Sequence, residues 1–401
     1  MPNALDNLIN LGESEKERLG AIHTPSEIRR QPCLWADTAE RMRERLPEIK
    51  DSMVSADRTA GGSAARSIVL SGAGSSDYVG RSVEQLLRRR LGVNVDSRPT
   101  TDVLVNPLGI LIPAIPYLVV LFSRSGGSPE SMGTFEVVRK VCHDARFLVI
   151  TCNPEGDLAR LSDRHPGEVI KVVLDPRTND KGLAMTSSFT NMTVAGQALG
   201  FIDEPDQFKA TVERMAEAGE RILSDYSDVI HDLAGEPFER AVFLGSGALT
   251  GVAHEAALKL QELTDGRVIT KSESFLGLRH GPEAVVDERT LVVYFVSQDS
   301  YRFKYEMDLM QELRDKSIGL RKLAVAARAS SEFAGLVDEC IEFDPHGRLA
   351  IPDDLRPPVD VIVGQLLGLF KSLELGLSPD NPSARGVINR VVQGVRLYSL
   401  D

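Results

Sequence analysis

SIVLSGAGSSD (residues 67–77) decides the fold, because a short apolar run ends there in a turn rich in glycine and serine. A helical period follows over residues 79–92, which is typical of a strand–turn–helix unit. Two further apolar runs, YLVVLFS (117–123) and FLVITCN (147–153), flank a helical stretch, TFEVVRKVCHDA (134–145). Strands that alternate with helices predict a parallel sheet covered by helices on both faces.

The same pattern recurs in the second half of the chain, in AVFLGSG (241–247), LVVYFVS (291–297) and KLAVAA (322–327). The glycine-rich turns and the central apolar runs of the two halves are each separated by 173 positions, as in the pairs Gly72/Gly245 and Leu118/Leu291. Two independent strand motifs at one offset predict a tandem repeat of an α/β domain. We therefore expect an α/β fold with two doubly wound domains, the first over residues 66–215 and the second over residues 216–401.

Residues 1–65 are predicted to form a helical extension. Thr24 and Pro25 give a helix start, and apolar residues recur at helical intervals from Trp35 to Ile49. Residues 61–63 (GGS) are expected to end this segment.

Composition excludes several classes of protein. With 42% hydrophobic and 26% charged residues, the 401-residue chain can bury a core and is not disordered. No window offers about 18 uninterrupted apolar residues, so we expect no membrane span. The 46 basic and 58 acidic side chains give a net charge of −12, which disfavours nucleic acid and anionic membranes as partners.

The four cysteines are scattered without CxxC spacing, which favours a reducing compartment over a disulfide framework or a structural zinc site. The polar, acidic N-terminus resembles no export signal. We therefore expect a cytoplasmic protein.

The two halves differ in hydroxyl groups at the predicted strand ends. Adding 173 to the serines at these ends, Ser76, Ser123, Ser125 and Ser128, gives Leu249, Val296, Gln298 and Tyr301. Ligands of open α/β sheets bind beyond the carboxyl ends of the strands. The first half is therefore predicted to bind a ligand at these strand ends. The second half is predicted to have the same fold without the ligand-binding hydroxyl groups.

The turn over residues 72–77 admits three interpretations. A dinucleotide fingerprint would need a third glycine, but Asp77 stands there. Serines alone could be helix caps and turn formers. The third interpretation is an anion site at a helix N-terminus, completed by the similar turn over residues 123–128. Because both turns are rich in serine and their counterparts are not, the sequence favours phosphate binding.

Residues 253–263 (AHEAALKLQEL) form a strongly predicted helix, on which Glu255, Lys259 and Glu262 share one face. The simplest interpretation is an exposed face with an i,i+4 ion pair. The next segment contains His280 in a predicted loop, where a functional imidazole is common. A carboxylate that moves a proton and a histidine that opens a sugar ring are together what aldose–ketose chemistry needs.

The chain resembles the sugar isomerase (SIS) superfamily over about residues 40–400, and most closely the bacterial galactosamine-6-phosphate deaminase/isomerase family, also called tagatose-6-phosphate ketose/aldose isomerases. The motifs behind this resemblance are SGAGSSDYVG, FSRSGGSPES, ITCNPEGDLA, LAMTSSFTNM, ESFLGLRHGPE and NRVVQGV. EAALKLQEL and RHGP also resemble the isomerase domain of glucosamine-6-phosphate synthase.

The resemblance implies two tandem SIS domains and a C-terminal tail that completes the active site. It implies that Glu262 shuttles a proton of the substrate between C1 and C2 and that His280 opens the sugar ring. In the synthases, the corresponding histidine comes from a neighbouring subunit. It also implies a sugar-phosphate site lined by Ser76, Ser123, Arg124, Ser125 and Ser128. One departure concerns a lysine near the C-terminus of the synthases, since residues 381–392 offer only Arg385 and Arg390.

The function that these observations predict is conversion of galactosamine 6-phosphate to tagatose 6-phosphate and ammonia, in amino-sugar catabolism, by a homo-oligomer without metal or organic cofactor. Lys259 would hold Glu262 charged or bind a substrate oxygen. One alternative is isomerisation of a plain sugar phosphate. Another is a sugar-phosphate-sensing regulator, although residues 1–65 lack the basic clustering of a DNA-binding domain.

Overall fold

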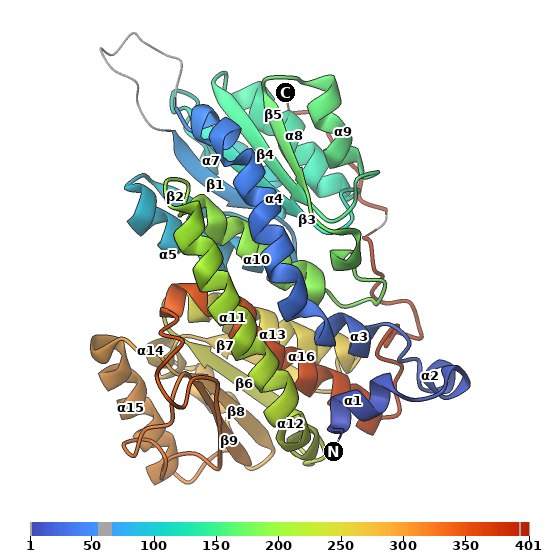
Figure 1. Cartoon of the computed structure of the whole chain (residues 1–401), viewed down its shortest axis with the longest axis vertical. Coiled ribbons are helices and arrows are strands. Elements are labelled where there is room, and N and C mark those ends of the chain that lie inside the picture. Colours follow the sequence, from blue (N-terminus) through green and yellow to red (C-terminus); the bar gives the residue numbers. More distant parts are fainter. Residues whose placement is uncertain (1, 55–65, 393, 401) are drawn as a thin grey trace. The chain divides into compact units, whose positions relative to one another are not determined.

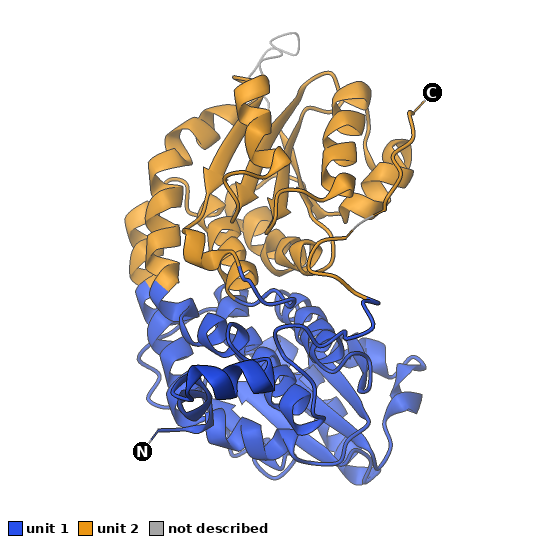
Figure 2. Cartoon of the chain, turned by 90° about the vertical axis from the view of Figure 1, so that its right-hand side faces the viewer, with its two compact units in different colours: residues 1–33, 180–186, 213–387 blue, residues 34–179, 187–212, 388–401 orange. Residues whose placement is uncertain are grey.

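The computed structural model describes residues 2–54, 66–392 and 394–400 (Figure 1). The predicted end of the N-terminal helical segment, residues 61–63, lies outside these described residues. Contacts divide the chain into two compact units (Figure 2). Unit 1 contains residues 1–33, 180–186 and 213–387, and unit 2 contains residues 34–179, 187–212 and 388–401.

Unit 2 holds the first copy of the repeat on a five-stranded parallel sheet of order β2-β1-β3-β4-β5. Its strands are β1 (Ser67–Ser71), β2 (Val95–Ser97), β3 (Tyr117–Ser123), β4 (Ala145–Thr151) and β5 (Val169–Val173). All seven residues of β3 are buried, as expected for a central strand that helices cover on both faces.

The helices of this unit follow the strands in alternation. They are α5 (Ser75–Leu91), α6 (Thr100–Val105), α7 (Pro107–Ile110), α8 (Pro129–Val141), α9 (Asp157–Arg164), the short η1 (Pro176–Thr178) and α10 (Ser187–Leu199), together with most of α4 (Gln31–Ser52). Every residue of α10 is buried, and this helix packs against α5.

Unit 1 holds the second copy on a five-stranded parallel sheet of order β10-β9-β8-β6-β7. Its strands are β6 (Arg240–Gly245), β7 (Ile269–Glu273), β8 (Thr290–Phe295), β9 (Arg321–Ala326) and β10 (Glu339–Glu342). Its helices are α1 (Ala4–Ile9), α2 (Glu13–Leu19), α3 (Thr24–Arg29), most of α11 (Pro205–Asp225), α12 (Ser227–Ala234), α13 (Leu249–Leu263), α14 (Phe275–Leu278), η2 (Pro282–Val285), α15 (Ser300–Asp315), η3 (Asp353–Leu355) and α16 (Pro357–Glu374).

The predicted tandem repeat is confirmed by topology and register. The second sheet, read from β7 to β10, has the order of the first sheet read from β2 to β5. Ser67 of β1 pairs with Tyr117 of β3, and Arg240 of β6 pairs with Thr290 of β8, so both pairs span 50 positions. The two copies therefore share one scaffold, and residues 173 positions apart can be compared directly.

Steric crowding explains the glycine that opens each strand–helix turn. A Cβ on Gly72 would lie 2.4 Å from the backbone carbon of Ser76, and one on Gly245 would lie 2.2 Å from the backbone oxygen of Leu249. Any larger residue would push the following helix away from its strand. These glycines therefore belong to the scaffold of both copies rather than to a dinucleotide site.

Element boundaries differ from the sequence prediction by a few residues. The helix predicted over 134–145 runs over Pro129–Val141, because Pro129 occupies the first helical turn and β4 already begins at Ala145. The predicted division of the chain into domains, with boundaries after residues 65 and 215, stays a prediction.

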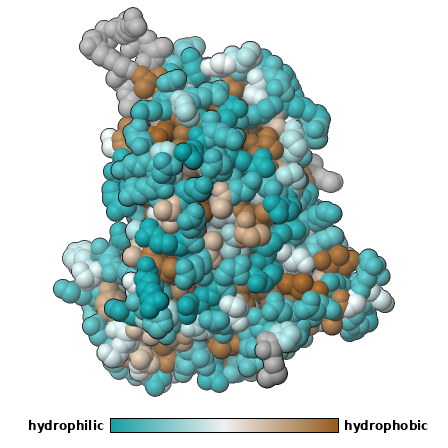
Figure 3. All heavy atoms as spheres, in the orientation of Figure 1, coloured by the Kyte–Doolittle hydropathy of each residue, from teal (hydrophilic) through white to brown (hydrophobic). Residues whose placement is uncertain are grey.

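Hydrophilic residues dominate the face of the molecule drawn in Figure 3, with hydrophobic residues in small scattered areas. Among the described residues, no helix combines the length and apolar character needed to cross a membrane.

Candidate active site

The first copy places its serine-rich turns at one edge of the sheet. β1 and β3 are hydrogen-bonded neighbours, with Ser71 opposite Leu121, so the turns that follow them emerge at the same carboxyl edge. Ser76 lies buried in the first turn of α5, and Ser123 lies buried at the end of β3. The two turns therefore lie at the carboxyl edge of the sheet, as the sequence predicted, and ligand binding by them stays a prediction.

The turn after β3 is held by its own hydroxyl groups. Ser123 Oγ accepts a hydrogen bond from the N–H of Gly126 at 3.0 Å, and Ser125 Oγ accepts one from the N–H of Gly127 at 3.3 Å. Ser128 Oγ donates to a carboxylate oxygen of Glu130 at 2.7 Å. A serine hydroxyl can still use its remaining lone pair or proton toward a ligand.

Arg124 is buried and contacts the C-terminal tail within unit 2. Its Nη2 donates to the carbonyl oxygen of Arg390 at 2.5 Å. The guanidinium of Arg390 in turn donates to Asn179 Oδ1 at 2.7 Å. The tail therefore passes directly beside one of the predicted phosphate-site residues.

Asp77 occupies the place of the third glycine in a dinucleotide fingerprint. Its carboxylate is buried and pairs with Arg81 Nε at 2.8 Å. Burial raises the pKa of Asp77, and Arg81 opposes that rise. The position that the fingerprint reserves for glycine therefore carries a buried, paired carboxylate.

In the second copy, α13 carries a cluster of three charged side chains, Glu255, Lys259 and Glu262. Lys259 Nζ lies 3.4 Å from Glu255 Oε1 and forms a closer ion pair with Glu262 Oε2. The side chains of Glu255 and Lys259 are fully buried, whereas that of Glu262 is 23% exposed. The interpretation as an exposed ion pair is therefore wrong, and Glu262 is the member of the cluster that a ligand can reach.

Close helix packing explains this burial. A Cβ on Gly364 of α16 would lie 2.5 Å from Ala256 Cβ, and one on Gly368 would lie 2.7 Å from Leu263 Cδ1. The two glycines thus allow α16 to approach α13 until the intervening side chains are shielded from water. A buried lysine needs charged partners, and the two glutamates supply them.

His280 lies on an exposed turn between α14 and η2. Its N–H donates to the carbonyl oxygen of Gly277 at 3.0 Å, and Ser274 caps α14 by accepting from the N–H of Gly277. The preceding strand β7 is tied to α13 through Thr270 Oγ1, which donates to the carbonyl oxygen of Ala257 at 3.0 Å. The histidine is therefore carried by a segment anchored to the helix of the charged cluster.

The structure thus groups the predicted residues in two sets. The predicted phosphate residues belong to unit 2, and the predicted acid–base residues belong to unit 1. Sequence reasoning missed the contact of Arg124 with the tail, and no local pattern could have revealed it, since its partner lies 266 positions away. Within the described ranges, no three histidine, cysteine or acidic side chains are grouped so that they could hold a metal ion.

Comparison with known proteins gives close relatives over almost the whole chain. The SIS domain family matches residues 63–201. A protein of Streptomyces coelicolor is 40% identical, covering 95% of this chain and 96% of its own length. D-galactosamine-6-phosphate deaminase AgaS of Escherichia coli is 34% identical, covering 94% of this chain and 95% of its own length.

A solved structure agrees with these sequence matches. The crystal structure of tagatose-6-phosphate ketose/aldose isomerase from Escherichia coli superposes with a TM-score of 0.83 at 32% identity, covering 94% of this chain and 96% of that one. The fold, the repeat and the similarity along nearly the full length agree, and the chain therefore belongs to the AgaS family of SIS-domain proteins.

Proposed function

We propose that this protein is an enzyme that converts galactosamine 6-phosphate into tagatose 6-phosphate and ammonia. Relatives at 34% identity over nearly the whole chain have the name D-galactosamine-6-phosphate deaminase. The structural observation behind the proposal is the cluster on α13, in which a partly exposed carboxylate lies against a buried ammonium group. A partly exposed carboxylate in this position can accept a proton from a bound substrate.

The proposed reaction begins with ring opening, which His280 assists by moving a proton between the ring oxygen and the C1 hydroxyl. Glu262 then removes the proton from C2 of the open 2-amino aldose and returns it to C1. The product of this transfer is a ketose imine at C2. Water adds to the imine carbon, ammonia leaves, and ketose 6-phosphate remains.

Lys259 has a supporting role in this proposal. Its side chain is fully buried, so it acts through Glu262 rather than as a freely accessible acid. Its ammonium group fixes the direction of the Glu262 carboxylate through their ion pair. Glu255, also fully buried, is the second carboxylate partner of Lys259.

The phosphate of the substrate is proposed to bind to the serine-rich edge of the first copy. Ser76 offers a hydroxyl group in the first turn of α5, where backbone N–H groups favour an anion. Ser123 and Ser125 offer hydroxyl groups at the end of the neighbouring strand β3. Ser128 and Arg124 complete the proposed set. Neutral donors and a helix terminus suit a phosphate in a protein whose net charge is −12.

An assay of ammonia release tests the reaction. Purified protein is given galactosamine 6-phosphate, glucosamine 6-phosphate and the matching hexose 6-phosphates, and ammonia and ketose are measured separately. We expect ammonia and tagatose 6-phosphate in equal amounts from galactosamine 6-phosphate. Ketose formed only from a hexose phosphate, with no ammonia from any amino sugar, would favour the second candidate, a plain aldose–ketose isomerase, to which the name of the similar crystal structure refers.

We further propose a cytoplasmic homo-oligomer in which His280 acts on the substrate of a neighbouring subunit. The exposure of His280 on a turn supports this assignment, and the four cysteines, which form no disulfide within the described part of the chain, suit a reducing compartment. Mixing the inactive variants His280→Ala and Glu262→Gln tests it. In a randomly mixed dimer, shared sites would restore about a quarter of the normal activity, whereas sites contained within one subunit would restore none.

A further inference from the structure

The second copy has a strand end that corresponds to the predicted phosphate turn of the first. The shared register places Val296, Ser297 and Gln298, which follow β8, at the positions of residues 123–125 after β3. Val296 and Gln298 stand where the first copy has Ser123 and Ser125, and Ser297 stands where it has Arg124. The donors of this strand end nevertheless all point to acceptors within the protein.

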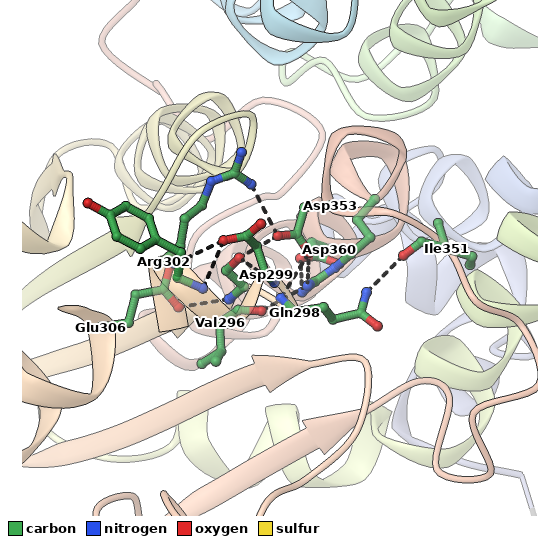
Figure 4. Close-up of polar contacts among 11 residues, drawn as sticks. Val296, Gln298, Asp299, Arg302, Glu306, Ile351, Asp353 and Asp360 are labelled. Atoms are coloured by element: carbon green, nitrogen blue, oxygen red, sulfur yellow. Dashed lines mark hydrogen bonds and ion pairs between the residues drawn. The ribbon is translucent and has the colours of Figure 1, made fainter. Parts of the chain in front are cut away.

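Asp353, the first residue of η3, supplies the main acceptor (Figure 4). Its carboxylate accepts from the N–H of Gln298 at 3.1 Å and from the hydroxyl of Ser297. It also accepts from Arg356 Nη1 at 3.0 Å and from Arg302 Nη1 at 3.4 Å. A hydroxyl, a backbone N–H and two guanidinium groups therefore converge on one oxyanion, as they do in sites that bind phosphate or carboxylate ligands.

The surroundings hold these donors in place. Arg356 is fully buried, and besides Asp353 it donates to Asp360 Oδ2 at 2.7 Å and to the carbonyl oxygen of Val296 at 2.8 Å. The remaining N–H of this turn, that of Ser297, donates to Glu306 at 2.8 Å. Because Arg356 keeps Asp360 as a partner, the donor set can persist when the side chain of Asp353 is removed.

Asp353 is itself held as an anion. Burial acts to raise its pKa, but Arg356 and the hydrogen bonds from Ser297 and Gln298 outweigh burial and lower that pKa. Its side chain is 6% exposed. An ionised, nearly buried carboxylate is thus fixed at a sheet edge where this fold binds ligands.

We propose that the end of β8 in the second copy is an oxyanion-binding site, which Asp353 fills in place of a ligand. The carboxylate of Asp353 accepts the hydrogen bonds that a small carboxylate or phosphate ligand would accept at this position. The donors of the second copy therefore need no bound anion. The comparison with the first copy rests on the proposed function, since it assumes a phosphate at residues 123–125. The donor set around Asp353 stands without that assumption.

A small anion has a route to this position. A cavity of about 710 Å³ opens beside it and is lined in part by Ser297, Gln298, Ser300, Arg328 and Phe333. Truncating Asp353 to alanine would leave a space next to this cavity that matches the missing carboxylate. Formate is a free carboxylate that can replace the carboxyl group lost in Asp353→Ala, and is therefore a suitable probe.

The test compares thermal unfolding of wild type and Asp353→Ala in sodium formate and in sodium chloride of equal ionic strength. We expect Asp353→Ala to lower Tm in chloride by more than about 5 °C, because it leaves two guanidinium groups without one of their carboxylates. Formate should restore at least half of that loss, while it changes the Tm of wild type little. Asp353→Asn, whose amide still fills the space, should be destabilised without recovery in formate.

Two further variants make the result specific. Asp180→Ala is the matched control, because Asp180 is also fully buried and accepts hydrogen bonds from the N–H and the hydroxyl of Thr186, but is not among the residues that line this cavity. The Tm of Asp353→Ala in formate and in chloride is also measured in a protein that carries Ser123→Ala and Ser125→Ala. A failure of the proposed phosphate site is then distinguished from a failure of the site around Asp353.

Equal effects of formate on Asp353→Ala and Asp180→Ala, or rescue that disappears in the serine background, would overturn the proposal. If Asp353→Ala is insoluble, the yield of refolding from urea in formate and in chloride replaces Tm. A higher yield in formate then supports the site, and equal yields refute it.

Discussion

Replacing Glu262 by glutamine should separate catalysis from folding. The substitution keeps the shape of the side chain and removes its basicity, so we expect kcat to fall by about 10²–10⁴, the usual contribution of a positioned acid–base group. Substrate binding should persist, because Glu262 is assigned to proton transfer and not to the phosphate. Exchange of the C2 hydrogen with solvent deuterium should disappear together with turnover.

The structure gives the reason why this variant should remain folded. Lys259 keeps Glu255 as a partner at 3.4 Å, a separation at which unit charges attract by about 5 kcal/mol at an effective dielectric constant of about 20. Much of this attraction offsets the desolvation of the two groups, but no buried charge is left alone. Glu262 is 23% exposed but its partner Lys259 is fully buried, so losing this pair should cost more than the about 1 kcal/mol of a surface pair and less than the about 3–5 kcal/mol of a fully buried one.

Glu255→Gln is the matched control on the same helix. This change breaks a fully buried ion pair, which typically costs about 3–5 kcal/mol, and the remaining contact of Lys259 with Glu262 should keep the loss near the lower end. We therefore expect a lowered Tm and a milder loss of kcat. Ammonia release, NMR of C2 exchange and thermal unfolding measure the three quantities.

Two outcomes would refute this reasoning. Near-normal turnover of Glu262→Gln together with complete loss in Glu255→Gln would show that the base lies two helical turns away. Normal turnover of both variants would show that the charged cluster serves packing alone.

Four other predictions concern binding, metal independence and stability. Ser123→Ala combined with Ser125→Ala should raise KM strongly, since each lost hydrogen bond to a charged group is worth about 1.5–3 kcal/mol, and should lower Tm slightly, because the N–H of Gly126 loses its buried acceptor; an unchanged KM would remove the phosphate site. Turnover should survive dialysis against EDTA, and recovery of lost activity by a divalent ion would point to a metal-assisted hydride shift. Asp380→Ala should destabilise the protein by about 2 kcal/mol or more in urea unfolding, because this carboxylate accepts from three backbone N–H groups and one hydroxyl over residues 22–24. Burial raises the pKa of Glu306 from 4.5 to about 7, so its stabilising effect is complete below the unfolded pKa and is lost as pH rises through about 7. Wild type should therefore lose up to about 3 kcal/mol relative to Glu306→Gln between about pH 5 and 8, and parallel stability curves would contradict this.

The sequence predicted all six interior strands of the two sheets and none of the four edge strands. β3 and β8 are buried along their whole length, and a continuous apolar run is visible in sequence. Edge strands such as β2 (VDS) and β7 (ITKSE) are short or partly exposed, so they carry no such run. Burial therefore decides which strands can be recognised from sequence.

The burial of the charged cluster could not be predicted from α13 itself. The spacing of Glu255 and Lys259 is the same in a solvated ion pair and in a buried one. Their environment depends on Gly364 and Gly368, about a hundred positions later, which let α16 come close. The contact between Asp353 and the end of β8 was hidden for the same reason, because the acceptor lies 55 positions beyond Gln298.

The two copies differ in a way that packing alone does not explain. The offset of 173 aligns Glu255 with Ser82 and Lys259 with Leu86 on α5. Leu86 is buried, so the same place in the fold accepts an apolar side chain in the first copy. Because apolar replacement of a buried ion pair is often neutral or stabilising, the fold does not require a lysine there. In the function proposed above, the charged cluster serves proton transfer at Glu262, and the strand-end serines of the first copy, which the second copy lacks, serve to bind the phosphate.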